Sequence, residues 1–245
     1  MKNWWWIGIL ILALGCNKPD APDCFQSSGD DTSELRELPG PIEKIEHFDL
    51  IDVVLIPGTS SELIVHAPSN LIPEVTTKYN NGVLTIENLN TCNFVRSYSR
   101  DFRVEVTVDT TLKEYRYESQ GKLTCTDTLD LNAFKLELFD ASGDVDLWMR
   151  ANDLKCFNHT GVATINLNGS SQQAEYFHQG YGTFDALDMI SNVTLAGNNS
   201  ISNLRLTAFD YLFCTISDAG NIYYLGEPDT IDSEISGDGE LISLD

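Results

Sequence analysis

Apolar and polar residues alternate between Pro41 and Asp109 with the period of two that is typical of half-buried β-strands. Clusters of proline, glycine and asparagine interrupt the alternation and predict turns. The clearest is Asn81-Gly82, because both residues tolerate the positive φ angles of a tight hairpin. This region should therefore consist of short strands joined by turns. The apolar positions that define them are Val53, Val54, Ile56, Leu63, Ile64, Val65, Val83, Leu84, Ile86, Val104, Val106 and Val108.

From Leu112 to the C-terminus the chain repeats itself about every twenty residues. Each repeat holds an apolar residue, a small polar turn that ends in glycine, one polar residue and further apolar residues. No helical periodicity accompanies it, so the pattern predicts a β-solenoid whose coils stack on one another. The residues that anchor the predicted turns are Gly121, Gly143, Gly161, Gly182, Asn199, Gly220 and Gly239.

The register of the repeat predicts which side chains face the core. Each turn should be flanked by two strands. Because side chains alternate across a strand, each of these strands should turn one face toward the core. We interpret His178, which falls in an inward column, as a core histidine. After the turns the expected inward residues are Leu123, Val145, Ala163, Phe184, Ile201, Ile222 and Leu241. Before the turns they are Tyr117, Phe139, Phe157, His178, Ile216 and Ile235.

The N-terminus reads as a lipoprotein signal. Residues 1–15 combine Lys2 with a short apolar run, and Leu12-Ala13-Leu14-Gly15-Cys16 resembles the bacterial lipobox, in which the cysteine is lipidated. An ordinary secretory signal is the alternative. Residues 16–40 are rich in proline, serine, glycine and aspartate and predict a short disordered tether, which leaves residues 41–245 as one domain. We therefore expect a lipid-anchored outer-membrane protein that faces either the cell surface or the periplasm.

Three segments resemble a known protein family: Phe48 to Ile56, Tyr79 to Ile86 and Ala219 to Pro228. On these segments, and over residues 42–244 as a whole, the chain is similar to the family named putative auto-transporter adhesin, head GIN domain, of secreted and lipid-anchored bacterial proteins. The resemblance implies an all-β fold, a right-handed parallel β-helix, and an adhesive role without known catalytic residues. The family's usual serine–glycine turns are replaced here, for example by Asp218-Ala219-Gly220, so the turns support no binding prediction.

The chain is strongly acidic, with a formal net charge of −22 at pH 7. Such a surface repels nucleic acid and anionic lipid headgroups, which argues against either as a partner. It is compatible with cationic partners, with divalent metal ions, or simply with solubility at a crowded cell surface.

Five cysteines remain if Cys16 is lipidated. Cys125 and Cys214 fall in inward positions about five coils apart, roughly 24 Å at ordinary strand spacing, which is too far for a disulfide. We expect both to be buried free thiols. Cys24 and Cys92 lie in irregular segments and could pair, and Cys156 is then left over.

The sequence offers little catalytic chemistry. It holds no nucleophile elbow, P-loop or dinucleotide fingerprint, and its four histidines lack metal-ligand spacing, so we predict no catalytic residues, no metal site and no cofactor. Three acids around one turn, Asp140, Asp144 and Asp146, are the exception. With Glu118 and Asp185 on flanking coils they could serve a polysaccharide lyase or hydrolase, or bind a metal ion. Otherwise they are solvated turn acids.

Aromatic residues on the outside of a flat solenoid make good platforms for sugars or proteins. The same residues could instead cap the last coil or pack a homo-oligomer. We therefore expect a non-catalytic binding or adhesive protein, with a cell-surface glycan or protein as ligand; a polysaccharide-degrading enzyme and a self-associating structural protein are the alternatives. The candidate binding residues are Trp148, Tyr176, Tyr181, Tyr211 and Tyr223.

Overall fold

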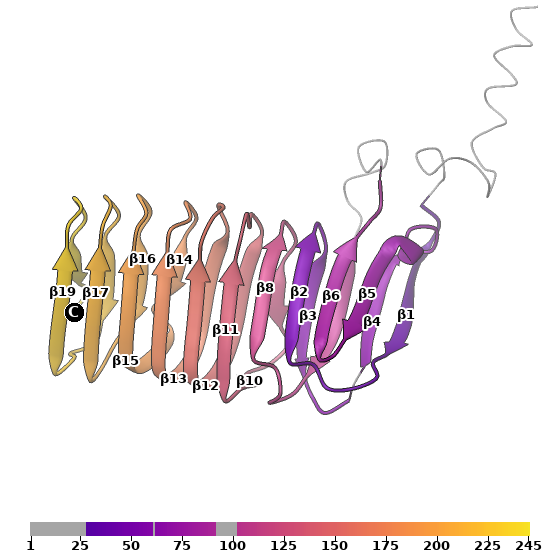
Figure 1. The fold of residues 1–245 in the computed structure, drawn as a ribbon, viewed down its shortest axis with the longest axis horizontal. Helices are drawn as coiled ribbons and strands as arrows, with labels where there is room; N and C mark the ends of the chain where they lie inside the picture. Colours follow the sequence, from indigo (N-terminus) through magenta and orange to yellow (C-terminus); the bar gives the residue numbers. More distant parts are fainter. Residues whose placement is uncertain (1–27, 61, 92–101) are drawn as a thin grey trace, which may run out of the picture.

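A computed structural model describes residues 28–60, 62–91 and 102–245, and over these ranges the chain is almost entirely β (Figure 1). Twenty strands belong to one continuous sheet, and the short 3₁₀ turn η2 (Ile72–Glu74) is the only helical element in the described ranges. The predicted signal peptide, the lipidation site Cys16 and the proposed Cys24–Cys92 pair lie outside them.

The strands fall into an N-terminal group and a repeating group. The first is β1 (Asp31–Glu37), β2 (Lys44–Asp49), β3 (Asp52–Pro57), β4 (Glu62–Pro68), β5 (Val75–Asn80), β6 (Val83–Asn88) and β7 (Arg103–Val108). The second is β8 (Glu114–Ser119), β9 (Leu123–Cys125), β10 (Leu129–Asp130), β11 (Ala133–Leu138), β12 (Asp144–Asn158), β13 (Thr164–His178), β14 (Phe184–Ala186), β15 (Met189–Asn198), β16 (Leu204–Thr207), β17 (Tyr211–Ile216), β18 (Ile222–Leu225), β19 (Thr230–Ile235) and β20 (Leu241–Ser243).

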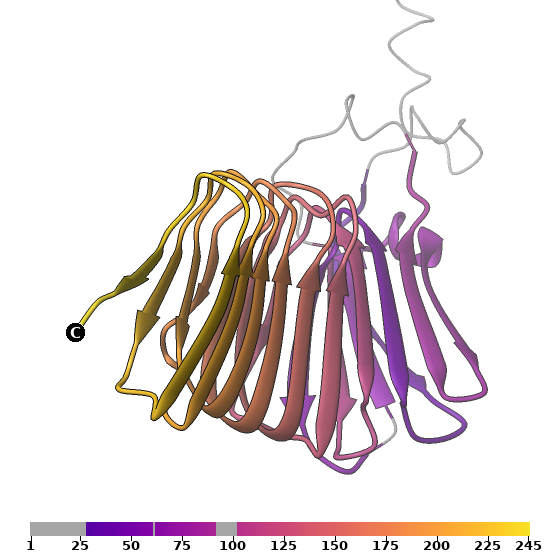
Figure 2. The same ribbon diagram turned by 60° about the vertical axis from the view of Figure 1, so that its left-hand side comes forward.

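The sheet winds into a parallel β-solenoid with two long faces, as predicted (Figures 1 and 2). Face A, toward the viewer in Figure 1, stacks β6, β2, β8, β11, the second halves of β12, β13 and β15, then β17 and β19. Face B stacks β7, β3, β9, the first halves of β12 and β13, then β14, β16, β18 and β20. A short third side joins β10 to the middles of β12 and β13 and to the start of β15.

The first coils do not stack in chain order. β2 lies between β6 and β8, and β3 lies between β7 and β9. The chain therefore runs from β3 to the N-terminal end of the solenoid, forms β4 to β7 there, and returns past β2 and β3. At this end β5 and β6 form the predicted hairpin, in which Asn81 (φ 48°) and Gly82 (φ 85°) adopt the left-handed conformation.

The N-terminal boundary of the domain differs from the prediction. Residues 31–37, which we assigned to the tether, form β1, which pairs antiparallel with all of β4. The sequence of β1, DTSELRE, gave no strand signal because every residue but Arg36 is exposed. Backbone pairing and Arg36, rather than burial of a hydrophobic face, hold this strand in place.

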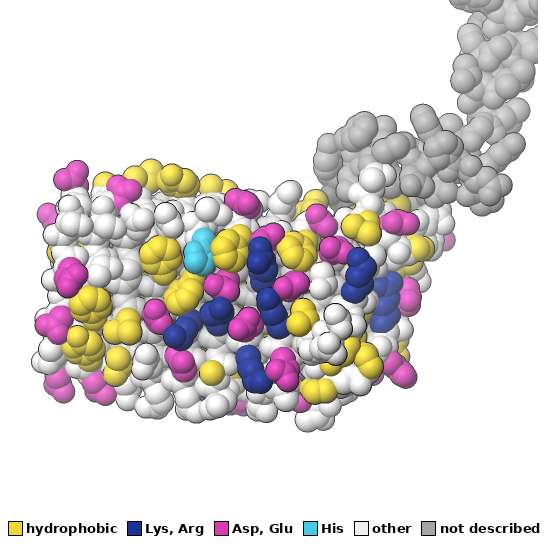
Figure 3. All heavy atoms as spheres, in the orientation of Figure 1, with side chains coloured by type: hydrophobic (Ala, Val, Ile, Leu, Met, Phe, Trp, Pro, Cys, Tyr) yellow, Lys and Arg dark blue, Asp and Glu magenta, His cyan; other side chains and the backbone are white. Residues whose placement is uncertain are grey.

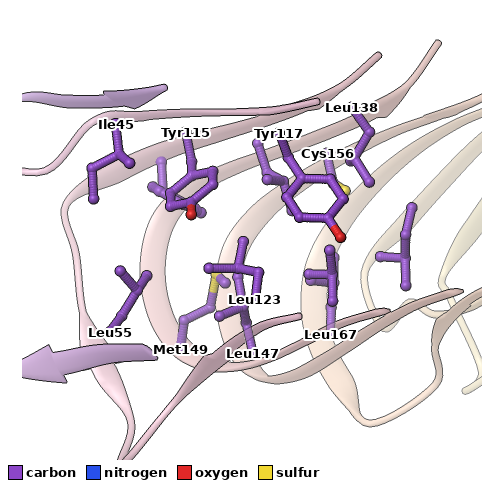
Figure 4. Packing of buried hydrophobic residues seen from close by; sticks show 14 of the residues in the cluster. Ile45, Leu55, Tyr115, Tyr117, Leu123, Leu138, Leu147, Met149, Cys156 and Leu167 are labelled. Atoms are coloured by element: carbon purple, nitrogen blue, oxygen red, sulfur yellow. The ribbon is translucent and has the colours of Figure 1, made fainter. Parts of the chain in front are cut away.

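The core consists of inward columns from the two faces that meet along the solenoid axis. Figure 4 shows Ile45, Tyr115, Tyr117 and Leu138 of face A opposite Leu123 and Leu147 of face B. Nearly all of these columns are fully buried, and burying a leucine or isoleucine side chain stabilises a fold by about 1.5–3 kcal/mol. Each column is completed only by neighbouring coils, so stability accumulates along the stack.

Two predicted anchors, Gly161 and Asn199, were wrong. The aligned turn positions are Gly121, Gly143, Ala163, Gly182, Ser202, Gly220 and Gly239, as shown by the carbonyl of the preceding coil that each glycine approaches. Gly161 instead forms a parallel bridge with Ala141. Each of these residues lies two positions before the aligned turn residue of its own coil, which is Ala163 or Gly143. Around Ser202 the Ser200 hydroxyl accepts a bond from the Ser202 amide (3.0 Å), as Ser119 does from Gly121 (3.0 Å).

Several side chains predicted to face inward do not, some because of the misplaced anchors and some because two turns are longer. Ile201 is exposed, and Leu204 takes its inward position in register with Phe184. Phe139 and Phe157 lie on the outside, where Leu138 and Asn158 face inward instead. The two turns concerned are one residue longer than the others, and Asp140 (φ 49°) adopts a left-handed conformation in the first of them. Predicted inward residues before the turns that are buried are Tyr117, His178 and Ile216.

The core contains a buried polar column on face A. Asn158, His178 and Asn198 occupy the same register on consecutive coils. The Asn158 amide nitrogen lies 3.2 Å from His178 Nδ1, and the Asn198 amide donates to the carbonyls of Ser202 (3.0 Å) and Asn221 (3.2 Å). Burial lowers the pKa of His178 to about 4, so this imidazole is neutral at physiological pH. His178 is thus a core histidine, as predicted.

Three cysteines lie in the described part of the chain, and all are free thiols. Cys156 and Cys214 are fully buried, and burial raises the pKa of Cys214 to about 12. Cys125 occupies the predicted inward column but is only partly buried. Its Sγ accepts a bond from the backbone amide of Trp148 (3.2 Å).

Candidate functional site

A hollow of about 490 Å³ lies on face B. Outward residues of β12, β13, β14 and β16 form most of its lining, because alternate residues of these strands point away from the core. Trp148 projects from β12 at one side with 52% of its surface exposed. The other lining residues are Asp146, Asn166, Leu167, Asn168, Asp185, Leu187, Asp188, Arg205 and Leu225.

A row of polar side chains crosses the hollow in register. Asp146 pairs with Asn166, Asn166 with Asp185, and Asp185 with Arg205. Consecutive members are about 4.8 Å apart, the spacing of neighbouring strands. The row therefore offers carboxylate, amide and guanidinium groups at regular intervals on a flat surface. Tyr223 continues it on β18.

Hydrogen bonds fix most of these side chains. Arg205 Nη1 donates to Asp185 Oδ2 (2.6 Å), and Asp185 Oδ1 accepts from the Leu187 amide (3.0 Å). Asn168 Nδ2 donates to Asp146 Oδ1 (3.1 Å) and to the Leu147 carbonyl (3.3 Å). The polar groups are thus held in place before any ligand arrives, which lowers the entropic cost of binding.

The acids considered for a catalytic or metal site have separate surroundings. Asp140 Oδ1 accepts from the Thr160 hydroxyl (3.0 Å) in a turn, while Asp144 pairs loosely with Lys122 (3.7 Å). Asp146 belongs to the face B row, and the flanking acid Glu118 pairs with Arg116 on face A. Among the described residues no group of three or more histidines, cysteines and acids is placed to hold a metal ion. Each acid has a separate structural partner.

The five aromatic candidates occupy separate places. Tyr176 is buried in the core, only 1% exposed, so its expected position on the outer face was wrong: it follows the inward alternation of β13. Tyr211 is partly exposed on face A, where its hydroxyl donates to Asp232 (2.9 Å). Tyr181 lies at a turn, and Trp148 and Tyr223 share face B. The structure therefore brings only the last two onto one surface.

Other parts of the surface have different chemistry. Over the middle of face A, acidic and basic side chains alternate (Figure 3) and pair, as in Lys135–Glu137 (3.0 Å) and Lys155–Glu175 (3.1 Å). The turns after β12, β13 and β15 expose Val162, Tyr181 and Ile201. The third side carries a second hollow, of about 480 Å³, along an external amide ladder. That ladder is Asn132, Asn152, Gln172 and Asn192.

Sequence reasoning found Trp148, Asp146, Asp185 and Tyr223 but missed the residues between them. Asn166 was missed because the repeat was anchored at Gly161 instead of Ala163, and Arg205 because it was anchored at Asn199 instead of Ser202. Aligning the second strand of each repeat on its apolar alternation would have revealed the row.

The family model described as "Putative auto-transporter adhesin, head GIN domain" matches residues 41–228. The chain belongs to this family. The comparison confirms the resemblance noted in the sequence, and the family is one of adhesin-like proteins, which points at that level to a cell-surface or envelope protein. No curated protein matches the chain. Among the described residues no helix is long and apolar enough to cross a membrane.

Solved structures share the fold at low sequence identity. A putative adhesin from Bacteroides fragilis superposes with a TM-score of 0.74 at 15% identity, covering 88% of this chain and 97% of that one. A putative adhesin from Parabacteroides merdae gives 0.60 at 19% identity, covering 89% and 97%. A putative lipid binding protein from Parabacteroides distasonis gives 0.60 at 18% identity, covering 89% and 98%. At these identities the likeness establishes the solenoid fold alone.

Proposed function

We propose that this protein is a lipid-anchored adhesin of the cell envelope that binds an extended glycan, without chemical conversion, along the Trp148 hollow of face B. The observation that carries the proposal is the half-exposed indole beside a row of carboxylate, amide and guanidinium groups, of which the carboxylates and the guanidinium are held by hydrogen bonds. Sugars present apolar C–H faces and a rim of hydroxyls. An exposed aromatic ring suits the former, and planar polar side chains suit the latter.

The shape of the hollow supports an extended ligand. The row from Asp146 to Arg205 crosses four strands, which spans about 14 Å at ordinary strand spacing. A single ring would cover only part of it. The row holds two carboxylates, one amide and one guanidinium, so the hollow suits a neutral or zwitterionic chain better than a polyanion, which the net charge of −22 would also repel.

A non-catalytic role agrees with the separate placement of the acids. Glycoside hydrolysis needs two carboxyl groups on either side of one bond, with one of them free to donate a proton. Asp185 is instead held by Arg205, and Asp146 by Asn168. Anchoring through Cys16 and display on the outer membrane rest on the lipobox resemblance at the start of the chain.

The proposal is tested by binding to an array of bacterial, host and dietary glycans, followed by titration of the best ligand. Trp148→Ala should weaken binding at least tenfold, because it removes the apolar platform, while the fold stays intact as judged by circular dichroism. Leu50→Ala is the matched control: Leu50 is similarly exposed, at 48%, but lies at the turn between β2 and β3. Equal affinities for the native protein and the Trp148 variant would remove the hollow as the site.

A further inference from the structure

The two ends of the solenoid are finished differently. At the N-terminal end β1 and η2 cover the outermost coil, and Leu71, Ile72 and Val75 are buried there. Arg36 of β1 donates to the Val75 carbonyl (2.7 Å) and to the Thr77 hydroxyl (2.9 Å), which fastens β1 to β5. The apolar core at this end is therefore covered by the protein's own chain, although within the described ranges β1 and β5 also leave one backbone edge unpaired.

The C-terminal end is open (Figure 2). Within the described chain β19 pairs only with β17, and β20 only with β18, so each leaves one edge of its backbone unpaired. All of β19 is exposed. Ile231 and Ile235 continue inward columns whose previous members, Leu212 and Ile216, are fully buried, yet they remain 41% and 49% exposed. The end thus presents an unpaired strand edge beside an unfinished core.

The charge of this end indicates what could pair with it. No lysine, arginine or histidine follows Arg205 in the sequence. In the last coil, residues 229–245, every charged side chain is acidic. These acids are Asp229, Asp232, Glu234, Asp238, Glu240 and Asp245. If β19 paired with the β19 of a second copy, Asp232 and Glu234 would face like charges, which is unfavourable across strands. A cationic strand would meet complementary charge instead.

We propose that the C-terminal coil is a docking edge for an extended basic peptide segment of another protein. The segment adds to β19 as a further parallel strand, and backbone hydrogen bonds supply affinity. Its alternate apolar side chains cover Ile231 and Ile235 and so continue the inward column. Its basic side chains, which point the other way, lie beside Glu234 and the neighbouring acids. The edge of β19 belongs to face A and shares no residue with the Trp148 hollow of face B, so its test is independent of the proposed glycan binding.

Fluorescently labelled peptides of the length of β19, with alternating valine and lysine, are the direct probe. Anisotropy measured on the purified full chain should show saturable binding that weakens as salt is raised, because the charges are exposed. The matching peptide with glutamate in place of lysine should not bind. A valine–lysine peptide N-methylated on the amides of one edge should bind at least tenfold more weakly, since it cannot complete the ladder. Hydrogen exchange should slow at Thr230–Ile235 when the first peptide is bound.

Two variants separate charge from packing. Asp229→Lys combined with Glu234→Lys should weaken the lysine peptide roughly tenfold and allow the glutamate peptide to bind, with Asp232 left in place because it accepts the Tyr211 hydroxyl. Ile235→Ser should also weaken binding of the lysine peptide, because it removes an apolar contact of the inward column. Asp144→Lys, an exposed reversal on a central coil, is the control and should change affinity less than twofold.

Three results would overturn the proposal. They are equal binding of the lysine and glutamate peptides, protection that maps away from β19, and unchanged affinity in the charge-reversed variant. Concentration-dependent dimerisation of the native protein that protects β19 and excludes the peptide would also contradict it, because the edge would then belong to a second copy.

Discussion

Replacing His178 should change how the stability of the protein depends on pH. His178 is fully buried between Asn158 and Asn198, and its imidazole is neutral in the folded state with a pKa of about 4. In the unfolded chain a histidine titrates near its usual value of about 6.5, so the unfolded state binds more protons between these values. The contribution of the neutral, buried His178 to the free energy of unfolding is therefore fully present at neutral pH. It is lost as pH falls from 6.5 toward 4, so the protein becomes less stable.

The size of the effect follows from the two pKa values. A shift from 6.5 to about 4 should remove about 2 kcal/mol of stability between pH 7 and pH 5, at roughly 1.4 kcal/mol per pKa unit. His178→Asn removes the titrating group and places an amide in line with its two asparagine neighbours. Relative to the native protein, this variant should gain about 2 kcal/mol on going from pH 7 to pH 5.

The assay is urea unfolding followed by far-ultraviolet circular dichroism at a series of pH values above the sequence pI of about 4.3. Asn198→Ala is the control, because it breaks the same polar column without removing a titrating group. Its free energy of unfolding should differ from that of the native protein by an amount that does not vary with pH. Parallel pH curves for His178→Asn and the native protein would refute the buried, neutral state of His178.

Three further predictions concern the coils, the thiols and the cap. Gly143→Ala should cost more than about 3 kcal/mol of unfolding free energy or prevent folding, because its Cβ would overlap the Gly121 carbonyl and the Tyr117 hydroxyl; a loss under about 1 kcal/mol would show that the turns are not packed this closely. Of the cysteines in the described ranges, iodoacetamide mapped by mass spectrometry should modify Cys125 in the native protein but Cys156 and Cys214 only after unfolding, because these two thiols are fully buried whereas Cys125 is partly exposed. Arg36→Ala should speed hydrogen exchange in β1 and β5 while leaving β17 unchanged. The same change in exchange rate in all three strands would contradict the role of Arg36 as a cap.

The fold was predictable because its signals are local and repeated. Alternation identified the strands, and Asn81-Gly82 identified the β5–β6 hairpin. The approximate period revealed the solenoid even though two anchors were misplaced, because the other turns carry glycine where a Cβ would meet the preceding coil. Ala163 and Ser202 hold the same turn position without glycine, and only the backbone register reveals them.

Features that depend on non-local pairing were not predictable. The sequence of β1 has no apolar alternation, so only its pairing with β4 identifies it as a strand. The placement of β2 between β6 and β8 joins segments far apart in the chain. The Trp148 hollow was found only in part for the same reason. Its acids and tryptophan stand out as residue types, but Asn166 and Arg205 become part of it only once the coils are aligned.

Protease treatment of intact cells shows whether the protein is accessible from outside, as an adhesin must be. The protein is followed by immunoblot beside a soluble periplasmic control. Our account predicts that it is digested while the control survives. Protection of the protein until the outer membrane is broken would contradict an adhesive role at the cell surface.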